Sequence, residues 1–162
     1  KKKLFTGWHD PELTEHGIHI AHELKEELYG IKFDIVYSSP LKRALSTAKI
    51  LIDDQDIIVD DRLKERSYGD WSAKNKEDVK LSEGEESYYA ARRGWETSPP
   101  NGESLKDVSL RVMPFIEELP GSGNILVVSH GNTIRAISVL FGKNTQDNVK
   151  NFEIQVGTVF KV

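Results

Sequence analysis

Residues 124–141, NILVVSHGNTIRAISVLF, decide the fold. Positions 124–129 form a continuous apolar, β-branched run, which is typical of a strand that is buried on both faces. The residues from Gly131 onward have the spacing of a helix. A buried strand that leads directly into a helix predicts an α/β fold, and it places His130 at the carboxyl end of the strand.

Shorter strands and further helices are predicted around this unit. The strand candidates are FDIVY (33–37), DIIVD (56–60) and a last strand in FEIQVGTVFKV (152–162). Helices are expected over 14–29 with Thr14 as N-cap, from 41 to about 52, over 85–95, and after Ser104. Residues 63–83 read as polar and irregular. This alternation predicts one domain over 1–162, with a mostly parallel sheet in a three-layer α/β/α arrangement.

Composition limits the partners and the chemistry. The net charge is −4, so neither nucleic acid nor an acidic membrane surface is an expected partner. The absence of Cys removes disulfides, thiolate metal sites and Cys nucleophiles, and it is compatible with the cytoplasmic location that we predict. No apolar stretch approaches the roughly 20 residues of a membrane span.

His130, Gly131 and Asn132 form the first candidate site. Ligands of open α/β sheets bind at the carboxyl ends of the strands, and a helix N-terminus there suits an anion. A His at this point can donate a hydrogen bond to a phosphoryl oxygen or move a proton. The alternative is a structural His at the end of a strand.

Arg43 is expected at the same edge of the sheet. It lies in the first turn of the helix that follows FDIVY. The guanidinium group binds phosphate or carboxylate in a bidentate manner. Taken alone, the pattern favours a solvated surface Arg.

The loop LKERSYGDW (63–71) combines acid, base and aromatic side chains just after a strand. Glu65 is a candidate general acid, provided that burial or neighbouring charges raise its pKa. An ion-paired loop without catalytic function is the alternative.

Two further groups of side chains lie on helices. Arg92 and Arg93, with Lys76 upstream, form a second candidate phosphate site, although adjacent Arg residues on a helix point in different directions. His16, His19 and His22 have the spacing of metal-ligand pairs, but no carboxylate or Cys completes a set, so we predict exposed helix positions and no metal.

Six motifs, in this order along the chain, carry a resemblance to a known family. They are LFTGWHDPELTEHG, YSSPLKRALSTA, LKERSYGDWSAKNK, YYAARRGW, PPNGESLKDVSLRV and VVSHGNTIRAI. Together they resemble the 2,3-bisphosphoglycerate-dependent phosphoglycerate mutases of the histidine phosphatase superfamily. The similarity extends from Leu4 to about Leu140.

The resemblance implies a reaction and a fold. Such enzymes interconvert 3-phosphoglycerate and 2-phosphoglycerate in glycolysis and gluconeogenesis, through a phosphohistidine that 2,3-bisphosphoglycerate primes, without a metal. The implied partners are small-molecule phosphoglycerates, and many members form homodimers. Positioning and charge neutralisation dominate phosphoryl transfer, which explains why cations converge in an acidic protein.

The resemblance also assigns roles to residues. It makes His130 a hydrogen-bond donor to the transferring phosphoryl group, Arg43 the phosphate clamp and Glu65 the proton donor and acceptor. The remaining substrate contacts that it implies are Thr6, Gly7, Arg66, Tyr68, Lys76, Arg92, Arg93, Gly131 and Asn132.

Two departures from the family pattern stand out. The family's nucleophile lies in an Arg-His-Gly motif at the end of a central strand, and these 162 residues contain no such motif. We therefore expect the first strand to be missing from this chain, FDIVY and NILVV to be left with unpaired edges, and the chain alone to be inactive. Ser67 stands where the mutases usually carry His.

Two other functions remain open. Ser67 favours a broader phosphomonoester phosphatase of the same superfamily. The absent nucleophile favours a non-catalytic module that binds phosphorylated ligands.

Overall fold

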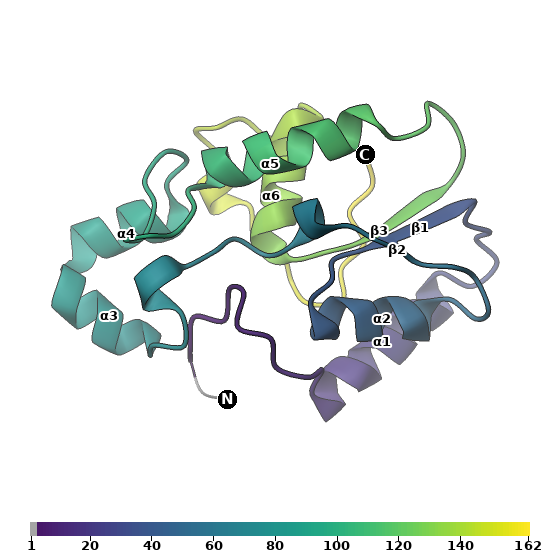
Figure 1. Ribbon diagram of the computed structural model, residues 1–162, viewed down its shortest axis with the longest axis horizontal. Helices are drawn as coiled ribbons and strands as arrows, with labels where there is room; N and C mark the ends of the chain where they lie inside the picture. The colour runs from purple at the N-terminus through teal and green to yellow at the C-terminus, as the bar shows by residue number, and fades with distance from the viewer. Residues whose placement is uncertain (1–2) are drawn as a thin grey trace.

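The computed structural model describes residues 3–162 (Figure 1). Its longer helices are α1 (Glu15–Glu27), α2 (Lys42–Leu51), α3 (Lys76–Glu83), α4 (Glu85–Arg93), α5 (Leu105–Glu117) and α6 (Gly131–Leu140). The strands are β1 (Ile35–Ser38), β2 (Ile58–Val59) and β3 (Ile125–Val128). Three short 3₁₀ turns complete the order: η1 (Asp61–Leu63), η2 (Gly69–Trp71) and η3 (Val149–Asn151).

The sheet is parallel throughout, with the strand order β2-β1-β3. Ile35 pairs with Ile125 and Ser38 with Val128, so β1 and β3 end level with each other. The residues that follow both strands therefore meet at one edge, as the sequence predicted.

Helices cover both faces of the sheet, which confirms the three-layer α/β/α prediction. Figure 1 shows α1 and α2 below the sheet and α5 and α6 above it. Val36 of β1 packs with α1 and α2 in one apolar cluster, and Val127 of β3 packs against a second cluster with α5 and α6. Apolar side chains on both faces of each strand explain why β3 reads as a continuous apolar run.

The expectation about the sheet edges is right for one strand and wrong for the other. Within residues 3–162, β3, the strand in NILVV, has an edge without a strand partner, as expected. β1, the strand in FDIVY, is instead the middle strand and pairs with β2 on one side and β3 on the other. The short β2 forms the opposite edge of the sheet.

The predicted last strand is also wrong. Residues 152–162 contain no strand, and Gly157 has a φ of +79°, which interrupts an extended conformation. Phe152 and Phe160 pack against each other with ring centroids 5.5 Å apart. The loose alternation in this segment reflects such packing and not pairing in a sheet.

Helix α3 lies in the region that we predicted to be irregular. Asn75 caps it by accepting a hydrogen bond from the Glu77 N–H at 2.9 Å, and Val79 is its only buried residue. One buried position gives no apolar stripe, so the periodicity was invisible. The Asn cap followed by acidic residues was the available signal.

A third apolar cluster fixes the first residues of the described chain against α3 and α4. Phe5 is fully buried and packs with Trp71, Val79 and Tyr88. Its backbone N–H donates to the Lys74 carbonyl at 3.0 Å. This cluster positions the turn that follows Phe5. In the part of the chain that the structure describes, no helix has both the length and the apolar character to cross a membrane.

Candidate active site

The candidate site lies at the carboxyl edge of the sheet. His130 follows β3 and Ser39 follows β1, and His130 Nε2 lies 2.8 Å from the Ser39 hydroxyl. Beside them is a pocket of about 190 Å³. Six predicted site residues line it together with Leu4 and Phe5: Thr6, Gly7, Arg43, Glu65, Tyr68 and Lys76.

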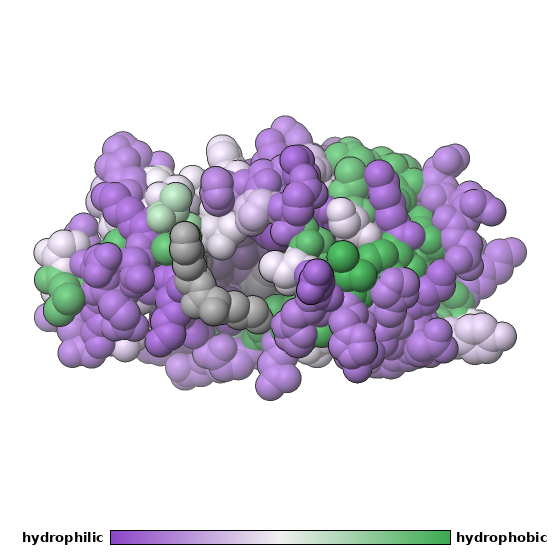
Figure 2. All heavy atoms as spheres, turned by 90° about the horizontal axis from the view of Figure 1, so that it is seen from below, coloured by the Kyte–Doolittle hydropathy of each residue, from purple (hydrophilic) through white to green (hydrophobic). Residues whose placement is uncertain are grey.

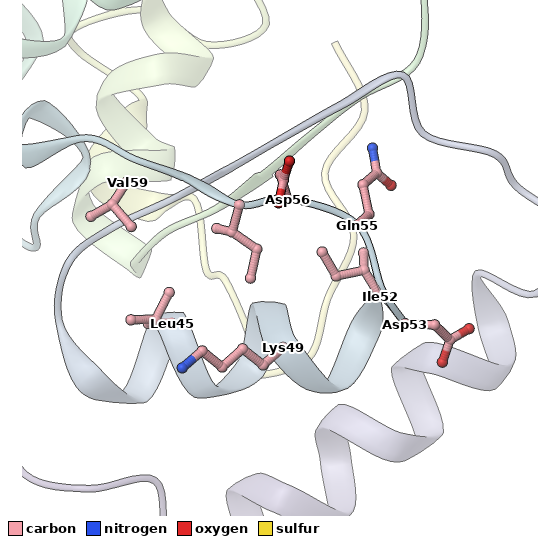
Figure 3. Close-up of a pocket in the computed structure, with 8 residues that line it drawn as sticks. Leu45, Lys49, Ile52, Asp53, Gln55, Asp56 and Val59 are labelled. Atoms are coloured by element: carbon pink, nitrogen blue, oxygen red, sulfur yellow. The ribbon is translucent and has the colours of Figure 1, made fainter.

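A second hollow, of about 420 Å³, lies between α2 and the segment that leads into β2 (Figure 3). Leu45, Ile52 and Val59 give it an apolar lining, and none of the predicted site residues reaches it. Figure 2 shows that the face seen from below is mostly hydrophilic, with apolar side chains gathered on the side where α1 and α2 lie. We place the chemistry at the smaller pocket, because the titratable groups converge there.

Arg43 organises one wall of the pocket. Its Nη2 donates to the Gly7 carbonyl at 2.8 Å and its Nη1 to the His9 carbonyl at 3.1 Å. Burial lowers the pKa of the Arg43 guanidinium, and Glu65 and Asp10 oppose that effect. An Arg nevertheless stays charged at neutral pH, so the wall carries a fixed positive charge.

The turn after Phe5 requires a glycine. Gly7 has a φ of +50°, and a Cβ there would lie 3.1 Å from the Tyr68 ring and 3.2 Å from the Arg66 carbonyl. The backbone of the turn therefore approaches the loop of Glu65 more closely than another residue would allow.

Glu65 has the properties of a general acid. Its carboxylate accepts a hydrogen bond from the Arg66 N–H at 2.8 Å and interacts with Asn132. Burial raises the pKa of Glu65, although these hydrogen bonds and the charge of Arg43 lower it. A carboxyl group whose pKa rises toward neutrality can both give and take a proton.

His130 is neutral at physiological pH. Burial lowers its pKa to about 3, and the positive charges of Arg43 and Arg111 add to the effect. The imidazole therefore acts as a hydrogen-bonding group, not as a cation. The other four histidines, His9 and those of α1, are exposed, so His130 is the one histidine of the sequence that the fold brings to the site.

Asn132, near the start of α6, forms hydrogen bonds with two other side chains of the site. Its Nδ2 donates to the Tyr68 hydroxyl at 3.0 Å, and its Oδ1 accepts from Arg135 Nη1 at 3.3 Å. Burial, and then the charge of Glu65, raises the pKa of Tyr68, which keeps the phenol protonated. Gly131 is the first residue of the same helix, so its backbone lies beside His130.

The basic residues of α3 and α4 form the other side of the site. Burial lowers the pKa of Lys76, and the charges of Arg92 and Arg93 lower it further, which places these cations close together. Arg92 lies over the Tyr88 ring at 5.8 Å, whereas Arg93 pairs with Glu153 at 2.8 Å. The two Arg residues point in different directions, as their adjacency predicted.

Arg66 does not face the pocket. Its side chain is fully buried, and its guanidinium donates to the carbonyls of Ala91, Arg92, Thr97 and Glu103. In an extended segment successive side chains point to opposite sides, so Glu65 faces the pocket and Arg66 faces the interior. The structure contradicts the prediction that Arg66 contacts substrate, and it makes Arg66 a tie between this loop and α4.

Three residues at the site were missed by the reading of the sequence: Ser39, Arg111 and Arg135. Ser39 follows a predicted strand, which was a usable signal. Arg135 lies one helical turn after Asn132, and that spacing places both on one helix face. Arg111 had no signal of its own, because its partners include backbone carbonyls.

The histidines of α1 are exposed, and His19 pairs with Glu23 at 3.3 Å. Over residues 3–162, no three His, Asp or Glu side chains converge in a way that would hold a metal ion.

Cations and a protonatable carboxyl group at the carboxyl edge of a parallel sheet are typical of α/β proteins that bind small anionic phosphoesters. The comparison with protein families identifies the class further. The chain belongs to the histidine phosphatase superfamily (branch 1), whose family model matches residues 1–162.

Two similar curated proteins carry the same name. A protein of Rhizobium etli (strain CIAT 652), named 2,3-bisphosphoglycerate-dependent phosphoglycerate mutase, is 42% identical over 168 residues, which cover 96% of this chain and 80% of that protein. A protein of the same name from Parvibaculum lavamentivorans is 39% identical over 170 residues, covering 97% of this chain and 80% of the relative.

The similar solved structures carry other names. A mycobacterial glucosyl-3-phosphoglycerate phosphatase has a TM-score of 0.81 at 27% identity, covering 92% of this chain and 76% of that one. A putative alpha-ribazole-5'-P phosphatase from Escherichia coli has a TM-score of 0.78 at 31% identity, covering 96% and 79%. The superfamily is thus shown, whereas mutase and phosphatase names both occur among the similar proteins.

Proposed function

We propose that the protein interconverts 3-phosphoglycerate and 2-phosphoglycerate, with 2,3-bisphosphoglycerate as the phosphoryl primer. The observation that carries the proposal is Glu65, a carboxyl group of raised pKa in a pocket that also holds Arg43 and Lys76. A mutase must protonate and deprotonate the substrate hydroxyl groups, and a carboxyl group of this kind is suited to that task. The curated relatives at about 40% identity support the proposal by name.

The sheet edge would bind the transferring phosphoryl group. Arg43 supplies charge, and His130 and the N-terminal residues of α6, Gly131 and Asn132, supply hydrogen bonds. Thr6 and Gly7 lie in the turn that Arg43 fixes, so we assign them contacts to the same end of the substrate. Donors that are held in place before the substrate binds stabilise the charge of the transition state effectively.

The helical side would bind the rest of the ligand. Lys76, Arg92 and Arg93 gather positive charge close to Tyr68. A phosphoglycerate carries a carboxylate, and the primer carries a second phosphate. Binding energy from these distant groups helps to position the reacting centre.

The experiment begins with the natural gene product, whose intact mass and N-terminal sequence are compared with the 18.3 kDa of these 162 residues. The gene product is then given 3-phosphoglycerate and a trace of 2,3-bisphosphoglycerate, and ³¹P NMR follows the products. We expect 2-phosphoglycerate to form faster than inorganic phosphate. Release of inorganic phosphate as the main product would overturn the mutase proposal.

A phosphatase is the second candidate. Ser67 at a position where the mutases usually carry His, and the phosphatase names among similar structures, favour it. The same NMR experiment decides between the two. Tight binding of 2,3-bisphosphoglycerate without any turnover would instead favour the binding module. The homodimer, the cytoplasmic location and the inactivity of the 162 residues alone stay predictions.

A further inference from the structure

An ion pair between Glu103 and Arg111 contacts the backbone of the segment that carries Glu65. Glu103 precedes α5 and Arg111 lies within it. Arg111 Nε is 2.8 Å from Glu103 Oε1, and Nη2 is 3.1 Å from Oε2. Both side chains are largely buried, with relative exposures of 19% and 18%. A bidentate, shielded pair of this kind has a fixed geometry.

The pair also binds the backbone on both sides of Glu65. Arg111 Nη1 donates to the carbonyls of Arg62 at 2.6 Å and Lys64 at 3.2 Å, and Nη2 reaches the Glu65 carbonyl at 3.5 Å. Glu103 Oε2 accepts from the Ser67 N–H at 2.8 Å. One ion pair thus holds three carbonyls and one N–H within six successive residues.

Regular secondary structure does not define the path of this segment. After η1 ends, the residues up to Tyr68 have no helical or strand conformation, so no ladder of backbone hydrogen bonds holds Glu65. Other contacts assist: Trp8 Nε1 donates to the Glu65 carbonyl at 2.6 Å, and Thr133 Oγ1 to the Lys64 carbonyl at 2.7 Å. Ser129 Oγ donates to the Leu63 carbonyl at 2.8 Å, and the Arg66 guanidinium ties the segment to α4. The ion pair is distinct because it binds backbone groups on both sides of Glu65 at once.

We propose that Glu103 and Arg111 are a positioning pair, which holds the Glu65 carboxyl group at the depth and orientation that proton transfer requires. The inference rests on the proposed function, in which Glu65 exchanges a proton with the substrate. Neither residue lines the pocket, so both act through the backbone of residues 62–67.

The guanidinium geometry is essential to this role. Arg111 addresses Glu103 and three carbonyls at once, and only a planar group with five donors can do so. A Lys at this position would keep the positive charge, but it could not form the two parallel hydrogen bonds to the Glu103 carboxylate. Arg111→Lys therefore separates the positioning of the segment from the electrostatic effect of a buried cation.

The titration midpoint of Glu65 reports how deeply its carboxyl group is buried. The groups that face it are Arg43 from α2, Tyr68 and the Arg66 N–H from its own loop, and Asn132 and Arg135 from α6. None of these residues is substituted in the variants that the experiment below compares. If the segment moves outward, water reaches the carboxyl group and its titration midpoint falls toward the ordinary Glu value.

The experiment compares the natural gene product with its Arg111→Lys variant. Carboxyl ¹³C NMR measures the midpoint of Glu65, and steady-state kinetics measures kcat and KM for 3-phosphoglycerate. We expect the midpoint of Glu65 to fall toward the ordinary value of a Glu side chain. We also expect kcat to fall by about 10- to 100-fold with a smaller change in KM, because misplacement of a catalytic group acts mainly on the chemical step.

Glu118→Gln is the matched control. Glu118 follows α5 and pairs with Arg62 at 2.7 Å, and within residues 3–162 Arg62 is the only hydrogen-bond partner of its side chain. It joins the same two elements, but it makes no contact with residues 63–67. The control should leave the midpoint of Glu65 and kcat unchanged.

A folded Arg111→Lys variant in which only the thermal stability falls, with the midpoint and kcat intact, would overturn the inference. If Arg111→Lys does not fold, Glu103→Gln tests the same pair, since it keeps the shape and weakens the bond to Arg111. The midpoint of Glu65 is independent of turnover. A shifted midpoint in a protein without mutase activity would support the positioning pair and contradict the proposed function.

Discussion

The two sides of the pocket hold their charged groups in different ways. On the sheet edge, Arg43 binds two backbone carbonyls, His130 meets Ser39, and Glu65 sits on a segment that Arg111 fixes. On the helical side, Arg93 pairs with Glu153, a side chain that is 69% exposed. The sheet edge is held mainly by contacts within the protein interior, whereas Arg93 is held by an exposed carboxylate and by the Lys150 carbonyl at 3.2 Å.

The difference suggests that one side serves the chemical step and the other serves ligand binding. Groups that are fixed to the backbone are already oriented when the ligand arrives, which is what a chemical step needs. Exposed ion pairs contribute little to stability and exchange partners readily, which suits the binding of a variable or distant anion. We therefore expect substitutions on the sheet edge to act on kcat, and those on the helical side to act on affinity.

The largest effect is expected from Glu65→Gln in the natural gene product. The amide cannot transfer a proton, so kcat for mutase turnover should fall by about 10²- to 10⁴-fold. The affinity for 2,3-bisphosphoglycerate, measured by calorimetry, should not weaken, because all the cations remain. Mutase turnover at the wild-type rate would show that Glu65 does not transfer the proton. It would also contradict the assignment of the chemical step to the sheet edge.

A comparison of two arginines tests the difference in stability. Arg66→Met leaves one buried and three partly buried carbonyls without their donor and should lower the free energy of unfolding by about 3 kcal/mol or more. Arg93→Met removes a surface pair and should lower it by less than about 1 kcal/mol. Urea denaturation measures both. Equal losses would contradict the contrast between a buried group that binds the main chain and a surface ion pair.

The buried imidazole predicts how stability depends on pH. The pKa of His130 is about 3 in the folded protein and close to 6.5 when the chain is unfolded, so the unfolded state binds more protons between these values. Stability should therefore fall as the pH falls, with His130 contributing about 2 kcal/mol of loss between pH 7 and pH 5.

Urea denaturation at both pH values measures this loss, and His130→Gln is the control because it removes the titrating group. The variant should lose less stability than the wild type over the same interval. An equal loss in the two proteins would show that His130 is not held neutral by the fold.

The smallest effect is expected from Glu153→Gln. Glu153 pairs with Arg93 and lies 3.8 Å from Arg135 Nη2, so its loss leaves both cations more available to an anion. Affinity for 2,3-bisphosphoglycerate should rise about two- to fivefold at low salt and less at high salt. Calorimetry with Glu117→Gln, an exposed position on α5, controls for the change in net charge. The same gain in both variants would attribute it to net charge alone.

Local signals in the sequence predicted the main helices and strands. Thr14 caps α1, and Ser104 and Asp107 form a reciprocal capping box at α5, as short-range preferences indicate. The apolar run before His130 became β3. The strand in 152–162 failed because alternation does not specify a pairing partner, and α3 was missed because a single buried Val79 leaves no pattern.

The site was predictable where topology alone brings residues together. His130 and Arg43 each follow a parallel strand, and parallel strands place such residues at one edge. The inward orientation of Arg66 and the role of Arg111 were not predictable, because their partners are mainly main-chain carbonyls. Every residue has a backbone carbonyl, so the amino-acid sequence does not indicate which carbonyls accept these hydrogen bonds.

The contact between His130 and Ser39 has a consequence for how the protein folds. These residues are 91 positions apart, and β1 and β3 pair over a nearly equal separation. Parallel pairing over such a distance requires a large loop to close first, which slows folding. During synthesis, Ser39 leaves the ribosome long before its partner exists. The contact between His130 and Ser39 is therefore made late, after α1 to α5 have been synthesised. A nascent chain that stops before β3 has the residues that line the pocket and the basic helices, but it lacks His130 and Asn132.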